Sequence, residues 1–198
     1  MISIDKNFIF VHVGKTGGTA IQSVLAGYCI DKVVYETRRG GEPQLILKNQ
    51  WRLGKHTPLW AYRERLPAAI YDKMTVAAAQ RNPWDRAVSV YFSAHQATPA
   101  WDPVRFRATI VRNMHPIAFY LSEIRGGRQA RADVLMRYES LQDDFDAFCG
   151  RLGIPRQTLP RINVSDRDPD YRVYYDRRLR QFIQARFPRD IALGAYNF

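Results

Sequence analysis

Residues 8–19 read Phe-Ile-Phe-Val-His-Val-Gly-Lys-Thr-Gly-Gly-Thr. An apolar run typical of a buried strand meets a basic, glycine-rich turn, and a helix is expected from Thr19 to about Tyr28. Glycines allow the tight turns in which successive backbone N–H groups point at one bound group. The positive end of the following helix strengthens that field. Lys15 adds a full charge, and Thr16 and Thr19 add hydroxyl groups. The segment therefore predicts an anion-binding loop of the kind that holds a phosphate.

A second strand candidate, residues 74–80, runs into Arg81-Asn-Pro-Trp-Asp-Arg-Ala-Val-Ser-Val-Tyr91. Asn82 followed by Pro83 is a helix-start signal, so this helix would also aim its N-terminus at a ligand of Arg81. Ser89 lies about 9 Å further along the helix at ~1.5 Å per residue, and it reaches the same ligand only if that ligand lies beside the first turns. Two anion sites after two strands predict a ligand that carries phosphates at two places.

The order of the first motif differs from that of a Walker loop. The Walker pattern places four residues between its first glycine and Gly-Lys-Ser/Thr, whereas here Gly-Lys-Thr precedes the glycine pair. A kinase or NTPase would also use an acidic residue after a second strand to hold Mg²⁺, where this chain has Arg81. A P-loop kinase or NTPase stays open as a rival enzyme class, and a non-catalytic binder of polyanions or nucleic acid as a rival of another class.

Together the two motifs resemble those of the PAPS-dependent sulfotransferases, in particular the Golgi-type carbohydrate family that contains the heparan and chondroitin O-sulfotransferases. Two weaker similarities follow in residues 135–141 and 187–198, so the resemblance spans nearly the whole chain. It implies sulfuryl transfer from PAPS, which leaves PAP, to a hydroxyl or amine of an acceptor, with a carbohydrate or glycoconjugate favoured. It also implies which residues bind the two ends of the donor. The 5′-phosphosulfate would be held by Lys15, Thr16, Gly17, Gly18, Thr19 and Ala20, and the 3′-phosphate by Arg81 and Ser89.

Sulfuryl transfer needs a cation for the charge that grows on the leaving phosphate and a base for the acceptor proton. Lys15 suits the first task. The resemblance implies a histidine base between the two phosphate motifs, and His56 occupies that interval, although Lys55 separates it from the glycine that often precedes this histidine. An ordinary pKa near 6.5 suits proton abstraction near neutral pH. A loop histidine that faces solvent or caps a helix is the alternative. The fallback bases are Glu36 and Glu64.

Other side chains have two open interpretations. His12 lies within the first strand, where a supporting or core role is expected. Trp84 could stack on an adenine ring or pack in the core at the start of its helix. Residues 161–165 form either a loop near the nucleotide, as in the resembling family, or an ordinary connection.

Composition limits the class of protein. The 198 residues are expected to form one domain, 1–198, and carry a net charge of +11 from 24 Arg and 6 Lys. Arginine-rich chains suit the recognition of phosphate or sulfate, although a GC-rich genome gives the same bias. Such charge also suggests nucleic acid. No basic run exceeds two residues and no nucleic-acid-binding signature occurs, so no nucleic-acid partner is expected.

Cellular location is predicted from cysteines and hydropathy. Cys29 and Cys149 stand alone and indicate a reduced compartment. No apolar stretch of 18 residues and no signal peptide precede the first strand, whereas the resembling Golgi enzymes carry a membrane anchor. The sequence predicts a cytoplasmic enzyme that needs no metal. Its oligomeric state is left open.

The pattern of elements predicts an α/β, P-loop-like three-layer fold with a central parallel sheet flanked by helices. Strands are expected at 8–13, 32–36, 74–80 and 134–138, and residues 38–56 are expected to form a surface loop. Further helices are expected over 103–112, 115–124, 140–152 and 169–187. Helix-start signals are Thr57 with Pro58, Asp102 with Pro103, Asp168 with Pro169, and Ser140.

Overall fold

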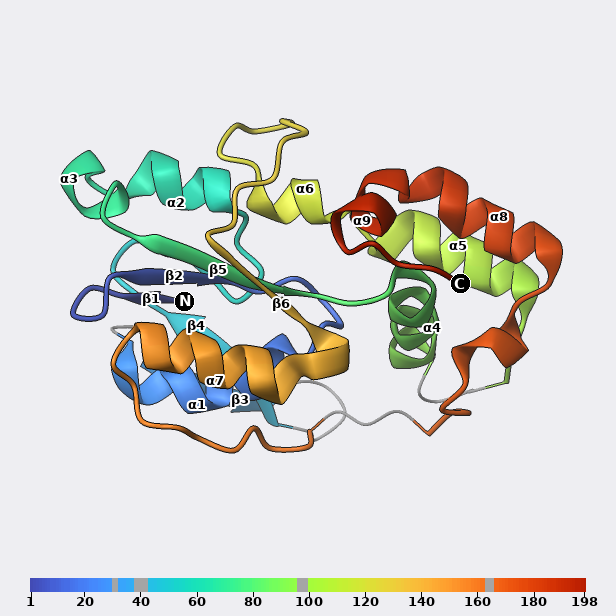
Figure 1. Cartoon of the computed structure of the whole chain (residues 1–198), viewed down its shortest axis with the longest axis horizontal. Helices are drawn as coiled ribbons and strands as arrows, with labels where there is room; N and C mark the ends of the chain where they lie inside the picture. The colour runs from blue at the N-terminus through green and yellow to red at the C-terminus, as the bar shows by residue number, and fades with distance from the viewer. Residues whose placement is uncertain (30–31, 38–42, 96–99, 163–165) are drawn as a thin grey trace.

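The computed structural model describes residues 1–29, 32–37, 43–95, 100–162 and 166–198, and only the backbone of 32–37 and 43–48. In this part of the chain the main sheet has the strand order β1-β2-β5-β6 (Figure 1). Its strands are β1 (Ile2–Ser3), β2 (Phe8–Val11), β5 (Thr75–Gln80) and β6 (Val134–Arg137). β2, β5 and β6 are parallel, and β1 adds an antiparallel edge. The three parallel strands therefore end at one edge of the sheet, where the predicted phosphate motifs begin.

Alternation of side chains divides the sheet into two apolar faces. Ile9 and Val76 belong to one buried cluster, and Phe10 and Ala77 belong to the other. The first cluster is covered by α2 (Leu59–Arg65), α3 (Ala68–Tyr71) and α6 (Ile117–Leu121), and the second by α1 (Gly18–Leu25) and α7 (Leu141–Arg151). Helices lie on both sides of the sheet in Figure 1. The predicted α/β architecture, with three layers and a central parallel sheet, is confirmed.

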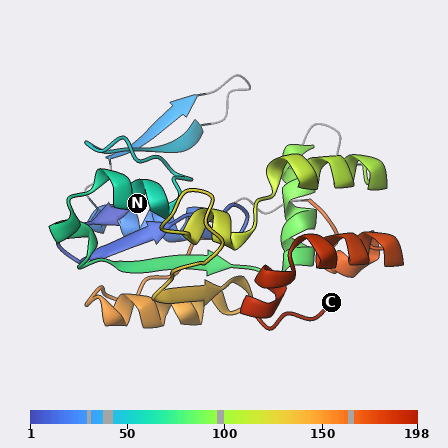
Figure 2. The ribbon, with the colours of Figure 1, turned by 90° about the horizontal axis from the view of Figure 1, so that it is seen from above.

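A third apolar cluster lies beyond the carboxyl edge of the sheet (Figure 2). It joins α4 (Pro83–Ala94), α5 (Pro103–Asn113), α8 (Arg177–Arg186) and α9 (Pro188–Leu193). Trp84 belongs to it: its side chain is buried and its indole N–H donates to the Arg180 carbonyl. Trp84 thus packs in the core, which is the second of its two interpretations.

The prediction of a loop over 38–56 was wrong in part. Pro43–Lys48 forms β4, which pairs antiparallel with β3 (Lys32–Thr37) in a separate two-stranded sheet. This hairpin stands apart from the main sheet in Figure 2. β4 is held by its pairing with β3, a contact that the pattern of residues 43–48 alone does not display.

Asp102, Asn82 and Ser140 take their predicted cap positions, whereas the other predicted helix starts differ. The carboxylate of Asp102 accepts from the N–H groups of Val104 and Arg105, and the side chain of Asn82 caps α4 through the N–H of Trp84. Thr57 instead accepts the N–H of Gly54 across its loop, and Pro58 takes the cap position of α2. Ser140 takes the predicted cap position of α7, but its hydroxyl donates to Asp144 and accepts no N–H of the first turn.

The single helix predicted over 169–187 was also wrong. The segment forms a short 3-10 helix, η3 (Tyr171–Tyr174), and then α8. Asp170 caps η3 and Asp176 caps α8, whereas Asp168 accepts the N–H of Asp170 in a local turn. The carboxylates that cap η3 and α8 therefore divide this segment into two helices, although its amphipathic pattern favours one continuous helix.

Within the described ranges, each helix is too short or too polar to traverse a bilayer.

Candidate functional site

The loop between β2 and α1 has the backbone of an anion site. Lys15 has a φ of 66° and Gly17 a φ of 82°, and Gly17 is the cap residue of α1. Alternation of left-handed residues with ordinary ones turns successive N–H groups inward, and the first N–H groups of a helix have no partner within that helix. A left-handed lysine is strained, and such strain concentrates at functional sites. The loop therefore keeps a strained backbone conformation in which its N–H groups can face a bound ligand.

Close packing fixes two of the glycines. A Cβ on Gly18 would lie 2.3 Å from the imidazole of His12, and one on Gly17 would lie 2.5 Å from Leu141. The loop backbone thus lies directly against the His12 side chain, which follows β2, on one side and the start of α7 on the other. Any larger residue at these positions would displace the N–H groups.

Arg86 of α4 fixes the same loop through its hydrogen bonds. Its Nε donates to the Gly14 carbonyl at 2.9 Å and one of its Nη atoms donates to the His115 carbonyl at 3.0 Å. Arg86 is buried, and its nearest carboxylate oxygen, on Asp190, is 3.8 Å away. The hydroxyl of Thr16 is also turned inward, where it donates to the Val13 carbonyl at 2.8 Å. Thr16 can therefore offer a ligand its backbone N–H, while its side chain closes the turn.

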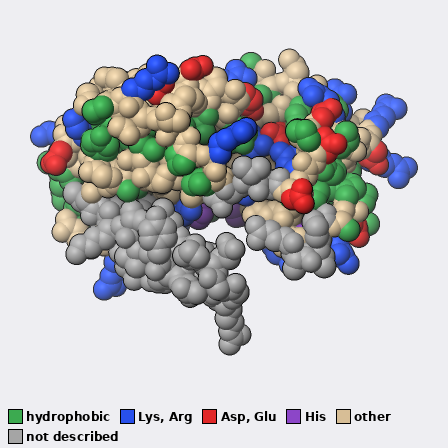
Figure 3. All heavy atoms as spheres, turned by 90° about the horizontal axis from the view of Figure 1, so that it is seen from below, with side chains coloured by type: hydrophobic (Ala, Val, Ile, Leu, Met, Phe, Trp, Pro, Cys, Tyr) green, Lys and Arg blue, Asp and Glu red, His purple; other side chains and the backbone are tan. Residues whose placement is uncertain are grey.

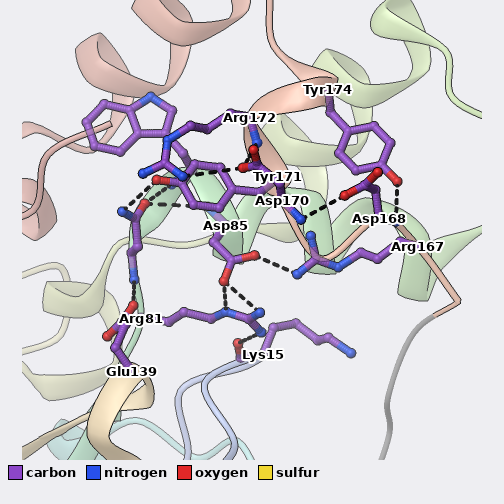
Figure 4. Close-up of polar contacts among 12 residues, drawn as sticks. Lys15, Arg81, Asp85, Glu139, Arg167, Asp168, Asp170, Tyr171, Arg172 and Tyr174 are labelled. Carbon is purple, nitrogen blue, oxygen red and sulfur yellow. Dashed lines mark hydrogen bonds and ion pairs between the residues drawn. The ribbon is translucent and has the colours of Figure 1, made fainter.

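Arg81 crosses from the end of β5 to the loop (Figure 4). Its Nε and Nη2 both lie 2.7 Å from one oxygen of Asp85, and Nη1 donates to the Lys15 carbonyl at 3.4 Å. The guanidinium also lies 3.8 Å from the ring centroid of Tyr138, the residue after β6. Arg81 is thereby fixed between the ends of all three parallel strands.

Arg167 contributes a second guanidinium to this place (Figure 4). Its Nη2 lies 2.5 Å from the other oxygen of Asp85, and its side chain is buried. One carboxylate therefore orients two arginines that come from segments 86 positions apart in the sequence, 81 and 167.

Most of the residues predicted to bind the ligand line one continuous hollow. Its inner part, of 80 Å³, is lined by Lys15, Gly17, Gly18, Thr19, Ala20, Arg81 and Ser89, together with His12, Tyr138 and Ile162. Its outer part, of 600 Å³, shares Arg81, Ser89 and Tyr138 with the inner part and extends to Arg161 and Arg167. Viewed from below, histidine and Lys or Arg side chains show together inside a recess of the molecule (Figure 3).

His12 and His56 lie next to the loop, with their ring centroids 4.6 Å apart and their ring planes tilted by 42°. Nδ1 of His56 lies 3.2 Å from the His12 carbonyl, which can only accept, so Nδ1 carries the hydrogen and Nε2 keeps its lone pair. Nδ1 of His12 bonds Oε1 of Gln22 at 2.8 Å in the same way. Burial lowers the pKa of His56 below its ordinary value, and the Lys55 charge lowers it further. The hydrogen bond to the His12 carbonyl raises this pKa, but by less. His56 is thus neutral and able to take a proton near neutral pH.

Positive charge accumulates around Lys15. Burial lowers the pKa of Lys15 below its ordinary value, and the charges of Arg81, Arg167 and Lys55 lower it further. Lys55 donates to the Thr19 hydroxyl at 3.1 Å, and burial lowers its pKa as well. Among the described residues, one carboxylate, Asp85, faces this partly buried cluster of four cations, so a bound anion is favoured because it offsets the remaining positive charge.

Some sequence expectations are not met and some site residues were not predicted. Glu64 is half exposed and pairs with Arg125 on the outer surface. The side chain of Glu36 lies outside the described residues, as do residues 163–165.

The site residues that sequence reasoning missed are Lys55, Asp85, Tyr138 and Arg167. Tyr138 had a usable signal, since it follows a parallel strand at the ligand-binding edge. Arg167 had none, because only the fold brings it near Arg81.

The described residues contain no cluster of three or more His, Cys, Asp or Glu side chains suited to a metal ion.

Comparison with known proteins adds little to this geometry. No family model matches the chain. A curated protein of Archaeoglobus fulgidus, described as uncharacterized, is 27% identical over 119 residues, which cover 58% of this chain and 97% of the relative. The crystal structure of a sulfotransferase from Alicyclobacillus acidocaldarius aligns with a TM-score of 0.38 and 19% identity, over 70% of this chain and 61% of that one. Resemblance at this level carries no argument about function.

Proposed function

We propose that this protein is a PAPS-dependent sulfotransferase that acts on a hydroxyl or amine of an acceptor. The observation that carries the proposal is the convergence of Lys15, Arg81 and Arg167 on one hollow at the N-terminus of α1. A donor with phosphate groups at two places satisfies both the loop and the arginine pair. The hollow of 600 Å³ falls in the usual range for a ligand of this size, roughly 300–1,000 Å³.

Each end of the donor has a matching set of residues. The 5′-phosphosulfate fits the N–H groups of residues 15–20, with the ammonium of Lys15 beside it. The 3′-phosphate fits Arg81 and Ser89, which line both parts of the hollow. Arg167 shares the Asp85 carboxylate with Arg81 and supplies a further charge. Tyr138 offers a ring beside the same space.

PAPS supplies an activated SO3 group on a phosphate oxygen. The acceptor oxygen forms a bond to sulfur while the bond from sulfur to the bridging oxygen breaks, and that electron pair stays on the phosphate of PAP. Lys15 stabilises the growing negative charge, and Lys55, which reaches Thr19, is placed to help. The acceptor proton goes to Nε2 of His56. His12 is a positioning residue, because its carbonyl holds Nδ1 of His56.

The acceptor class rests on sequence resemblance alone, which favours a carbohydrate or glycoconjugate. Fold and nucleotide site do not determine an acceptor. An acceptor screen with labelled PAPS, with simple sugars and phenols as parallel arms, is the experiment that assigns it.

PAP is expected to stabilise the folded protein far more than ATP with Mg²⁺ does. PAP satisfies both phosphate positions, whereas ATP places its three phosphates in one row. A ligand at a hundred times its Kd adds ~2.7 kcal/mol, which for a chain of this length raises Tm by roughly 5–10 °C. Thermal unfolding followed by circular dichroism, with each nucleotide at equal concentration, measures the difference.

Two controls make that result decisive. EDTA should leave the PAP shift unchanged, and polyphosphate should give a smaller shift that disappears with added salt. Equal shifts with PAP and Mg-ATP would contradict the proposal and support a kinase or NTPase. A shift with polyphosphate as large as that with PAP would support a non-catalytic polyanion binder.

A further inference from the structure

A second cavity, of 540 Å³, lies on the far side of α6 from the phosphate loop. Its walls come from α2, α6, the turn at 122–128 and the junction of α8 with α9. These segments lie together in Figure 1, where the turn rises above α6. Apolar surface dominates its floor and sides, with Trp60, Phe119 and Phe187 as the aromatic members. Phe119 is 44% exposed, so its ring offers accessible apolar surface to this cavity.

The cavity is separate from the proposed sulfuryl-transfer site. Among the residues that the structure describes, none lines both this cavity and the hollow that contains Lys15 and Arg81. Neighbouring residues of α6 serve the two sides, because Phe119 lines this cavity whereas Tyr120 lines a smaller space beside Lys15. A ligand in the cavity therefore does not compete with a nucleotide for contacts.

The walls are preformed by hydrogen bonds within the turn. The Ser122 hydroxyl bonds both the carbonyl and the N–H of Ile124, and Gly127 donates to the Ile124 carbonyl at 2.8 Å. A Cβ on Gly127 would lie 2.2 Å from the Ser122 hydroxyl, so the turn is tightly closed. The guanidinium of Arg125 is seated 4.2 Å from the ring centroid of Trp60. The cavity does not need to be opened by its ligand.

Positive charge surrounds its mouth. The lining includes four arginines, which we call the rim arginines: Arg125, Arg128, Arg186 and Arg189. Arg189 donates to the Arg128 carbonyl, and Arg186 donates to the Val111 carbonyl. Each of these bonds uses one of the five N–H donors of a guanidinium. Asp190 is the acidic residue of the lining, and it is buried and directed to the N–H of Ile117. Arg125 also pairs with Glu64 at 3.7 Å, and the other three rim arginines leave an excess of positive charge over an apolar interior.

We propose that this cavity is a second ligand site, for a small amphipathic acid with an aromatic or aliphatic body and a carboxylate or sulfate end. The body packs between Trp60, Phe119 and Phe187, and the anionic end meets the rim arginines. Charge complementarity selects this occupant over a neutral apolar molecule, because guanidinium groups bind carboxylate and sulfate in a bidentate manner.

Calorimetric titration with 2-naphthoate as the probe tests the site, with the uncharged naphthalene-2-carboxamide as its matched control. The acid is expected to bind at least about tenfold more tightly than the amide, because it keeps a charged hydrogen bond. Phe119→Ala and Arg189→Gln should each weaken naphthoate about tenfold. Val104→Ala and Arg156→Gln, which change an exposed apolar residue and an exposed arginine elsewhere, should leave the affinity unchanged.

The titration is repeated with PAP present, and the expected affinity for naphthoate is the same. Loss of naphthoate binding in PAP would place the probe in the nucleotide hollow and overturn the proposal. Equal binding of acid and amide, or equal weakening by the cavity variants and the distant variants, would overturn it as well. A failure of PAP to bind would contradict the sulfotransferase proposal alone and leave this test intact.

Discussion

Replacement of Lys15 by alanine is expected to reduce single-turnover transfer from PAPS by about 10²–10³-fold and to weaken PAP by about tenfold or more. The ammonium meets the donor in the ground state and the leaving phosphate in the transition state, so its loss affects both binding and rate. A charged hydrogen bond is worth roughly 1.5–3 kcal/mol, and one group that stabilises developing charge is worth about 10²–10³ in rate. Rapid-quench measurement with saturating labelled PAPS separates the two effects.

Lys73→Ala is the matched control, because Lys73 is exposed on the turn that leads into β5, away from its carboxyl end. Both alanine variants remove one lysine charge and lower the net charge equally. Alanine also leaves the left-handed backbone at position 15 with a similar strain, so the loop should keep its conformation. Wild-type transfer by the Lys15 variant at saturating PAPS would remove this residue from the chemistry.

The His56→Ala enzyme is expected to bind PAP with nearly unchanged affinity and to turn over about 10²–10⁴-fold more slowly, the usual contribution of a general base. The base works when deprotonated, so activity should fall as the pH drops through the pKa of His56. Burial and the Lys55 charge lower that pKa below about 6.5, so the wild-type rate should already be on its plateau at neutral pH. The acid limb of the rate profile should disappear in the variant.

His115→Ala provides the comparison, since His115 is exposed and its ring stacks on Phe119 instead of approaching the phosphate loop. Added imidazole should restore part of the rate of the His56 variant and none to wild type. A His56→Ala enzyme with wild-type turnover would exclude this base and direct attention to Glu36, since Glu64 is engaged with Arg125 on the surface.

The layers of the fold could be predicted because each has a strong local pattern. The apolar run of β2 and the alternating faces of Ile9 and Phe10 require burial on both sides, and the cap at Asn82 requires a helix at Pro83. β4 could not be predicted, because it is stabilised by pairing with β3, and the sequence of one strand does not specify which other strand it pairs with. The break before α8 depends on whether Asp168, Asp170 or Asp176 provides the cap, and all three carboxylates are plausible from sequence.

The candidate site divides in the same way. Lys15 and Arg81 occur in motifs whose spacing has a physical meaning, and the structure places both on one hollow. Arg167 and Lys55 occur in no such motif, and they reach the site through tertiary contacts with Asp85 and Thr19. Thr16 shows the opposite failure: a motif residue whose hydroxyl is used to close the turn. Sequence identifies the loops that bind, whereas folding decides which side chains face the ligand.

The most direct test of the two-phosphate site is a titration of PAP and of adenosine 5′-phosphosulfate, which lacks the 3′-phosphate, against wild type, Arg81→Ala and Ser89→Ala. Wild type is expected to prefer PAP, and Arg81→Ala should weaken PAP by roughly 10–100-fold while it changes the other ligand little. Ser89→Ala should act in the same direction with a smaller effect, since it removes an uncharged donor. Equal weakening of both ligands by both variants would contradict the placement of the 3′-phosphate and, with it, the central claim.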